Sequence, residues 1–228
     1  MSEFDVYRDT YRNEIEQALP FAGLDLDRFT AVKAGHLVEL AERCLGPPGE
    51  LAALDVGCGT GETDRFLAGA FGSLNGADIS EGLLDRARQT NPGVEYRHYE
   101  PGGLPYEDGT FDLSFCINVM HHVPPPEWHA FVAEMGRITR RGGIVAVFEH
   151  NPLNPLTRRV VSRCAFDEDA VLLRRRRAEQ LLEGAGLLPA ERAYILFVPV
   201  GAGWARAVER PLRWVPLGAQ YYVAGRVT

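Results

Sequence analysis

The residues best placed to do chemistry are three glycines at every second position, Gly57, Gly59 and Gly61, with carboxylates nearby. Asp55 lies two residues before the first glycine, and Asp78 follows seventeen residues after the last. Glycine lets the chain turn sharply and lets a ligand approach the backbone where a Cβ would clash. A dinucleotide loop instead has the spacing Gly-x-Gly-x-x-Gly, with the pyrophosphate on a helix N-terminus. The different spacing, with Asp55 before the loop and Glu62 just after it, therefore disfavours a pyrophosphate and suits a ligand that carries positive charge.

The sequence around these glycines predicts a buried strand, a tight turn and a helix. Residues 51–56 form a short apolar run that stops at the first glycine, as expected of a buried parallel strand. Residues 62–71 carry apolar side chains at helical spacing. A strand, a glycine turn and a helix make up the first crossover of a doubly wound sheet, where such sheets hold a nucleotide-like ligand.

The segment from Leu54 to Glu62 resembles motif I of the class I S-adenosylmethionine (SAM)-dependent methyltransferases. SAM matches the ligand expected from the residues, because it has a sulfonium, an ammonium and a ribose but no phosphate. The resemblance extends from about residue 29 to residue 227. It implies methyl transfer to a small-molecule acceptor, such as a sugar, a lipid or a secondary-metabolite intermediate, with S-adenosyl-L-homocysteine (SAH) as the other product.

Strands and helices alternate along the rest of the chain, which indicates a mostly parallel sheet. We expect strands at 51–56, 74–79, 94–99, 111–117, 144–150, 193–198 and 220–227, and helices at 29–45, 62–71, 81–89, 125–139 and 178–185. The resemblance implies a Rossmann-like doubly wound α/β fold with seven strands in the order 3-2-1-4-5-7-6, the last antiparallel. We expect a single domain, 1–228, with an N-terminal helical lid and helix at 1–45 and an insertion near the acceptor site at 200–218.

The second element of the cofactor site is the carboxylate after the second expected strand. Asp78 would accept hydrogen bonds from both ribose hydroxyls, since it lies at the carboxyl end of that strand. Ile79 beside it offers an apolar face for adenine. Alternatively, Asp78 or Ser80 simply caps the helix that follows.

Three further cofactor residues are implied by the resemblance. Glu100 is the acidic residue nearest to the family position that accepts from the adenine amino group, although it is equally consistent with a solvated loop. Asn118 and Val119 are placed at the end of the fourth strand, against the methionine tail and the adenine.

Three histidines are the candidate bases, and we expect them to serve in the order His150, His122, His121. An oxygen nucleophile needs a base with a pKa near neutrality, which favours histidine. A carbon or amine nucleophile needs no strong base, so the methylated atom is left open. Alternatively, one of the two adjacent histidines packs inward and the other is solvated. Because neighbours in sequence point apart on most backbones, and no acidic set of the metal-dependent catechol type is visible, we expect no metal.

The acceptor side is expected at two places. Glu149 and Asn151 follow the fifth strand at the carboxyl edge, where open α/β sheets bind substrates, although they equally fit turn residues before prolines. Tyr7 and Tyr11 lie in an N-terminal stretch that resembles the lid of many small-molecule methyltransferases, a device that excludes water. Lys33 belongs to the same stretch, and a simple packing helix explains it as well.

Composition limits the partners and the location. The net charge is −7, which argues against nucleic acid as the main partner, because phosphate binding depends on Lys and Arg. Four cysteines without a Cys-x-x-Cys pair indicate reduced thiols. The N-terminus is too charged for a signal peptide, and no apolar run has transmembrane length. We therefore expect a cytoplasmic protein without a membrane span, as a monomer or homodimer.

Other functions stay open. A fold relative that binds SAM without transferring methyl would act as a regulator or a cyclase-type enzyme. An RNA or protein methyltransferase would keep the same cofactor site, although the acidic balance counts against RNA. A nicotinamide-dependent oxidoreductase would need the third glycine one residue later and a loop that accepts phosphate.

Overall fold

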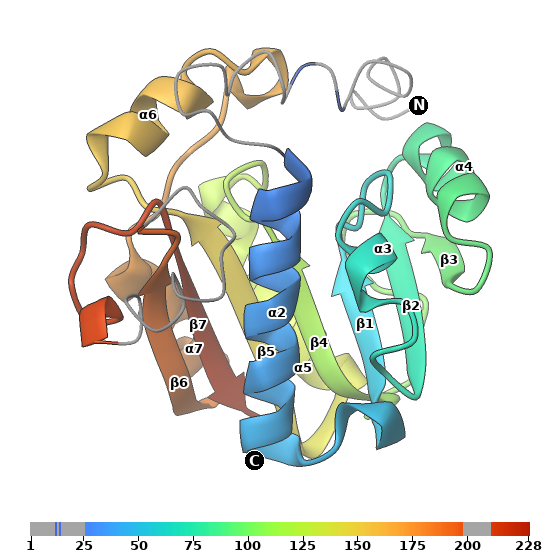
Figure 1. Cartoon of the computed structure of the whole chain (residues 1–228). Coiled ribbons are helices and arrows are strands. Elements are labelled where there is room, and N and C mark those ends of the chain that lie inside the picture. Colours follow the sequence, from blue (N-terminus) through green and yellow to red (C-terminus); the bar gives the residue numbers. More distant parts are fainter. Residues whose placement is uncertain (1–11, 13, 15–25, 198–210) are drawn as a thin grey trace.

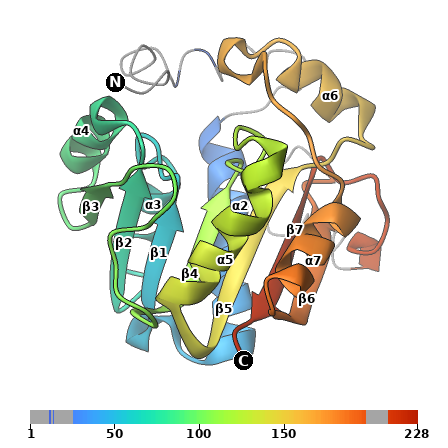
Figure 2. The same cartoon turned by 180° about the vertical axis from the view of Figure 1, so that it is seen from behind.

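The computed structural model describes residues 12, 14, 26–197 and 211–228. Tyr7 and Tyr11 lie outside the described residues, as do most of the expected lid and residues 198–210 of the expected insertion. The described part is a sheet covered by helices on both faces (Figures 1 and 2). None of its helices combines the length and apolarity needed to cross a membrane.

Seven strands form one sheet in the order β3-β2-β1-β4-β5-β7-β6. They are β1 (Ala52–Val56), β2 (Ser73–Asp78), β3 (Glu95–His98), β4 (Phe111–Ile117), β5 (Thr139–His150), β6 (Leu188–Ile195) and β7 (Gln220–Arg226). The first five are parallel, and β7 pairs antiparallel with both β5 and β6. The expected strand order and the antiparallel last strand are confirmed.

The helices make two layers around this sheet. They are α2 (Leu26–Leu45), α3 (Asp64–Leu67), α4 (Glu81–Thr90), α5 (Trp128–Ile138), α6 (Pro155–Val161) and α7 (Arg175–Gly184), with short 3-10 turns at Pro48–Glu50, Pro125–Glu127 and Ala165–Asp167. Figures 1 and 2 show α2 and α3 on one face and α5 and α7 on the other. The helix α6 lies above the carboxyl ends of the parallel strands (Figures 1 and 2).

The central strands are buried on both faces, because successive side chains of a strand point to opposite sides of the sheet. Phe115 of β4 and Phe148 of β5 pack in the core beneath α2, whereas Cys116 and Val147 belong to the core beneath α5 and α7. Strands buried in this way are near-continuous apolar runs, as found for parallel sheets generally. Their polar residues are therefore concentrated where the strands end.

Four of the expected elements that have other limits in the structure differ for identifiable reasons. The helix expected at 62–71 is the single turn α3, because Gly69 adopts a left-handed φ of 81° soon after it. The helix expected at 125–139 splits into a 3-10 turn and α5. The strand β5 starts at Thr139 and includes Gly143, whose Cβ would lie 2.7 Å from a carbonyl oxygen of β4. The strand β6 starts at Leu188, five residues before the expected strand, since its first residues are mostly exposed and leave no apolar run.

Candidate functional site

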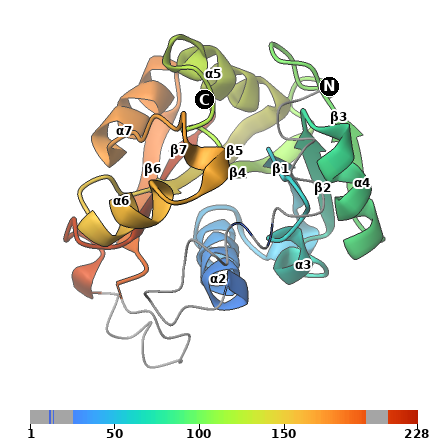
Figure 3. The ribbon, with the colours of Figure 1, turned by 90° about the horizontal axis from the view of Figure 1, so that it is seen from above.

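The glycine turn lies at the carboxyl end of β1, on the edge of the sheet seen from above in Figure 3. Gly57 and Gly61 adopt left-handed φ angles of 78° and 72°. A Cβ on Gly57 would lie 2.6 Å from Cγ2 of Val119, and one on Gly61 would lie 2.5 Å from Nδ2 of Asn91. Both positions therefore need glycine for conformation and for space. Gly59 also has a positive φ, of 55°.

Asp78 is tied to this turn through both of its carboxylate oxygens. The backbone N–H of Gly59 donates to Oδ2 at 2.8 Å, and the backbone N–H of Ser80 donates to Oδ1 at 2.9 Å. Burial raises the pKa of Asp78, and these backbone N–H groups oppose the rise. The side chain of Ser80 caps α4 by accepting from the N–H of Leu83, so the helix cap is Ser80. Asp78 thus keeps further lone pairs for a ligand beside the glycine turn.

The other expected cofactor residues surround the same turn. Ile79 is partly exposed beside Asp78, and Val119 contacts the glycine turn as described. Asn118 has a left-handed φ of 58°, rare for a residue with a side chain. Glu100 is exposed in the loop after β3, where its role stays a prediction.

A pair of buried acids lies beneath the turn, at Asp55 of β1 and Asp64 of α3. Asp64 was not expected from the sequence, and its Oδ2 accepts from the hydroxyl of Tyr96 at 2.8 Å. Burial raises the pKa of Asp64 to about 6. Burial and the charge of Asp64 raise the pKa of Asp55 well above its usual range. A proton is therefore held between the two carboxyls, so that Asp55 contributes less negative charge than its position in the sequence suggests.

The shift at Asp64 predicts a stability difference that depends on pH. The folded pKa of about 6 lies above the ordinary 3.8, so the native state binds the proton more tightly than the unfolded chain does. Its stabilising contribution is complete below pH 3.8 and is lost as the pH rises through about 6. Asp64→Asn should therefore match the wild type in thermal stability near pH 4 and exceed it by about 3 kcal/mol above pH 7. A stability difference between the two proteins that stays constant with pH would contradict the buried, shared proton.

Glu149 and His121 form a buried pair where β4 and β5 end. Nδ1 of His121 lies 2.7 Å from Oε2 of Glu149, and the two side chains are 1% and 0% exposed. The backbone N–H groups of His121 and His150 also donate to this carboxylate, at 3.3 and 3.1 Å. Burial opposes the charge on His121, but Glu149 and Asp167 outweigh it and raise the pKa of His121 to about 10. Glu149 was expected to face the acceptor, and in the structure it is enclosed behind His121.

Asp167 brings the two adjacent histidines together. Its Oδ1 lies 3.4 Å from Nε2 of His121 and 3.3 Å from Nε2 of His122. The two imidazole rings have their centroids 4.1 Å apart. The expectation that these neighbours point apart is therefore wrong, because the loop after β4 leaves extended geometry and turns both rings to one carboxylate. Asp167 belongs to the 3-10 turn after α6, and no motif in the sequence marks it.

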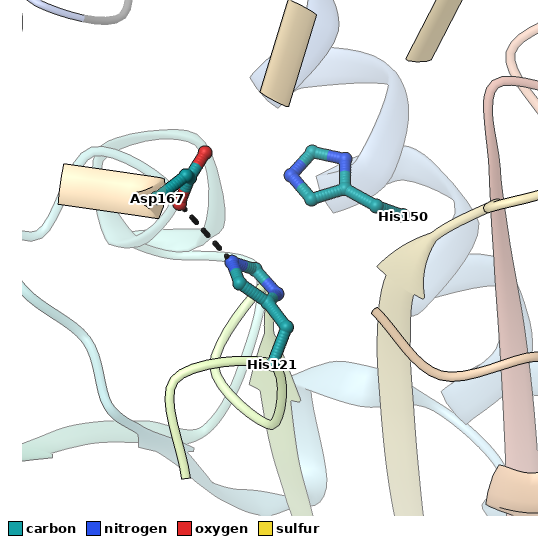
Figure 4. Close-up of side chains that lie close together, drawn as sticks. All are labelled: His121, His150 and Asp167. Atoms are coloured by element: carbon teal, nitrogen blue, oxygen red, sulfur yellow. Dashed lines mark ion pairs between the residues drawn. The ribbon is translucent and has the colours of Figure 1, made fainter. Parts of the chain in front are cut away.

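His150, at the end of β5, completes the histidine cluster. The antiparallel pairing of β5 and β7 puts Gln220 directly opposite it, and Nε2 of Gln220 lies 3.3 Å from Nδ1 of His150. The same amide nitrogen donates to Oδ1 of Asn118 at 3.2 Å. Burial, together with the charge of His121, lowers the pKa of His150 to about 4. Figure 4 shows the rings of His121 and His150 and the carboxylate of Asp167 facing a common space.

Two other expected residues have defined surroundings. Lys33 of α2 is 7% exposed, and burial lowers its pKa to about 8 against the opposing charges of Asp55 and Glu149. Its ammonium thus lies near both the glycine turn and the histidine cluster. Asn151 was expected to contact the acceptor, but its amide donates to the carbonyl oxygens of Pro216 and Gly218. Asn151 therefore stabilises the turn before β7.

Comparison with known proteins finds that this chain is similar to methyltransferases. A family model described as a methyltransferase domain matches residues 53–143. An uncharacterized methyltransferase of Synechocystis is 31% identical over 120 residues, which cover 52% of this chain and 56% of that protein. The 2-methyl-6-phytyl-1,4-hydroquinone methyltransferase of Synechocystis is 26% identical over 197 residues, covering 78% of this chain and 60% of that protein. The matches thus span less than two thirds of either relative.

A solved structure shares the fold over the whole length. It is a SAM-dependent methyltransferase from Thermotoga maritima, described as a possible histamine N-methyltransferase. The two structures agree with a TM-score of 0.67 at 20% sequence identity, over 99% of this chain and 98% of the other. The sequence motif, the matched domain and the strand order together support a class I SAM-dependent methyltransferase.

Proposed function

We propose that this protein transfers a methyl group from SAM to a small-molecule acceptor. The observation that carries the proposal is the anchoring of Asp78, whose two oxygens are held by backbone N–H groups on either side of the glycine turn. A carboxylate fixed in this way accepts a pair of neighbouring hydroxyls, such as those of a ribose. The hydroquinone methyltransferase among the relatives supports a small-molecule acceptor for this chain as well.

The residues present fit SAM on chemical grounds. The glycine turn leaves space that a Cβ would fill, and acidic side chains rather than a phosphate-binding arrangement surround it. Lys33 offers a buried ammonium near the turn, which suits the carboxylate that SAM carries. Bound SAM supplies an electrophilic methyl group on a sulfonium.

The histidine cluster would receive the acceptor. As the bond from the acceptor atom to the methyl carbon forms, the carbon–sulfur bond breaks and its electron pair stays on sulfur. A hydroxyl acceptor also loses its proton, which His150 or His122 would accept, because both are neutral near pH 7 whereas His121 already carries a proton. Glu149 holds the ring of His121, and Gln220 contacts that of His150, so both rings are oriented before the acceptor arrives. The expected order of the three bases, the oligomeric state and the exclusion of nucleic acid stay predictions.

Calorimetry on the purified protein tests the cofactor half of this proposal. We expect SAM and SAH to bind with micromolar dissociation constants, and NAD not to bind, because Gly57, Gly59 and Gly61 lack the spacing of a dinucleotide loop. Tighter binding of NAD than of SAH would contradict the proposal in favour of an oxidoreductase.

Transfer itself is tested with SAM labelled in the methyl group. We expect label to appear in a small aromatic or aliphatic hydroxyl compound from an acceptor panel that includes hydroquinones. Binding of SAH with transfer of label only to RNA or protein would contradict the small-molecule acceptor. Binding with no transfer to any class would favour the regulator or cyclase-type alternative.

A further inference from the structure

We infer that His121, His150 and Asp167 form a binding site for a divalent cation of the zinc class. Each residue offers one ligand atom, and the three atoms all lie within 4.8 Å of one another. The residues come from the loop after β4, the end of β5 and the turn after α6, which meet above the carboxyl edge of the sheet. The inference of a cation site depends only on the contacts among these residues, whereas its part in methyl transfer rests on the function proposed above.

The donor set selects the kind of cation. Two imidazole nitrogens and one carboxylate oxygen are the ligands found in open catalytic zinc sites, which keep one position for water or substrate. Magnesium and calcium prefer sets made of oxygen alone, so imidazole favours zinc and its first-row neighbours. Ligand atoms bound at about 2.0–2.2 Å in a tetrahedron lie about 3.3 Å apart. The His121–Asp167 separation of 3.4 Å already matches, and His150 has to approach by a small side-chain movement.

The groups behind the ligands match a metal site as well. A histidine that binds a metal usually gives its other ring N–H to a carboxylate or carbonyl oxygen, which fixes the tautomer. Nδ1 of His121 lies 2.7 Å from Glu149, so its Nε2 is the nitrogen facing the cluster. Nδ1 of His150 faces the amide of Gln220, and Oε1 of that amide is buried without a hydrogen-bond partner. A half-turn of the Gln220 amide would let its Oε1 accept from Nδ1–H of His150. The other ring nitrogen of His150, Nε2, would then be left to bind the cation.

Asp167 supplies an independent observation. Asp167 is 8% exposed, and its Oδ1 lies 3.4 Å from Nε2 of His121 and 3.3 Å from Nε2 of His122, with no hydrogen bond of ordinary geometry. A cation bound between this oxygen and Nε2 of His121 would replace the proton that His121 carries there, as metal binding to histidine generally does. The expected absence of a metal rested on the neighbours His121 and His122 and on the lack of a visible acidic set, whereas the ligands inferred here come from three separate segments.

The open position of such a site would accept an oxygen or sulfur atom of the acceptor. A hydroxyl placed there would lose its proton to water more readily, because the cation stabilises the negative charge left on oxygen. The oxygen then takes the methyl group while the electron pair of the carbon–sulfur bond stays on sulfur. The inferred acceptors are therefore hydroxyl or thiol compounds, and not carbon or amine nucleophiles that need no activation.

Cobalt(II) titration of the metal-stripped protein, followed by visible absorption, tests the site without an activity assay. We expect one equivalent of cobalt(II) to give the intense bands of a tetrahedral site, and zinc(II) to displace it. Asp167→Asn should weaken cobalt binding by at least about 10-fold, a loss typical of altered metal sites. The matched control is Asp169→Asn, two residues away and exposed, which should bind like the wild type. Circular dichroism of each variant establishes that it is folded.

Two results would overturn the inference. One is a wild type that binds neither cobalt(II) nor zinc(II) stoichiometrically; the other is an Asp167→Asn variant that binds as tightly as the wild type. SAH calorimetry on the same samples separates this outcome from failure of the proposed function. SAH binding without cation binding removes only the metal site. Cation binding without SAH binding leaves the metal site in place and removes the methyl-transfer role.

Discussion

Replacing Asp78 with alanine is expected to lower the affinity for SAH by about 100-fold. Hydrogen bonds to a charged group contribute about 1.5–3 kcal/mol each, and the two ribose hydroxyls would lose one apiece. A total of about 3 kcal/mol corresponds to roughly a 100-fold change in dissociation constant. The substitution also leaves the N–H groups of Gly59 and Ser80 without their acceptor, so the turn itself loses its anchor. Calorimetric titration of each variant with SAH measures the effect.

Two further variants make this prediction sharper. Asp78→Asn keeps one acceptor oxygen and should lose less affinity than Asp78→Ala. Asp85→Ala removes a half-exposed carboxylate of α4 and should bind SAH like the wild type. If Asp78→Ala bound SAH within about threefold of the wild type while remaining folded, the ribose role of Asp78 would be wrong. Thermal unfolding of each variant without ligand measures how far the substitution destabilises the glycine turn, separately from the loss of affinity for SAH.

Replacing Glu149 with leucine is expected to destabilise the fold by about 3–5 kcal/mol, as is usual when one partner of a buried ion pair is removed. The substitution leaves Nδ1 of His121 and the backbone N–H groups of His121 and His150 without their acceptor. For a chain of this size, the loss corresponds to a fall in melting temperature of roughly 10 °C. Calorimetric unfolding in the presence of a chelator measures it without any contribution from a bound cation.

A double-mutant cycle separates the pair from general loss of packing. His121→Leu in the Glu149→Leu background removes the histidine that has lost its partner, so the double variant should be more stable than Glu149→Leu alone. Glu149→Gln keeps an acceptor oxygen and should fall between the wild type and Glu149→Leu. Additive effects of the two leucine substitutions would show that Glu149 and His121 do not act as a pair.

Much of the fold follows from local sequence patterns. The apolar run before Gly57 predicts β1 because a strand buried on both faces has to be apolar, and the run from Phe111 to Ile117 predicts β4 for the same reason. Patterns of this kind fail where burial is one-sided or absent. The first residues of β6 are mostly exposed, and α3 has a single turn, so neither has a periodic signal that matches its real limits.

The cofactor half of the site is a local property of the chain, whereas the histidine cluster is not. Gly57 and Gly61 follow directly from a strand–turn–helix pattern, because left-handed φ angles and close side-chain contacts restrict both positions to glycine. Asp78 follows from its position at the carboxyl end of the next strand. Asp167 and Gln220 carry no such local constraint. They reach the cluster because the turn after α6 lies over the carboxyl edge, and because antiparallel pairing places the start of β7 opposite the end of β5. The sequence therefore specifies the residues that we propose to bind the nucleoside, and the long-range pairing of segments specifies which groups form the histidine cluster.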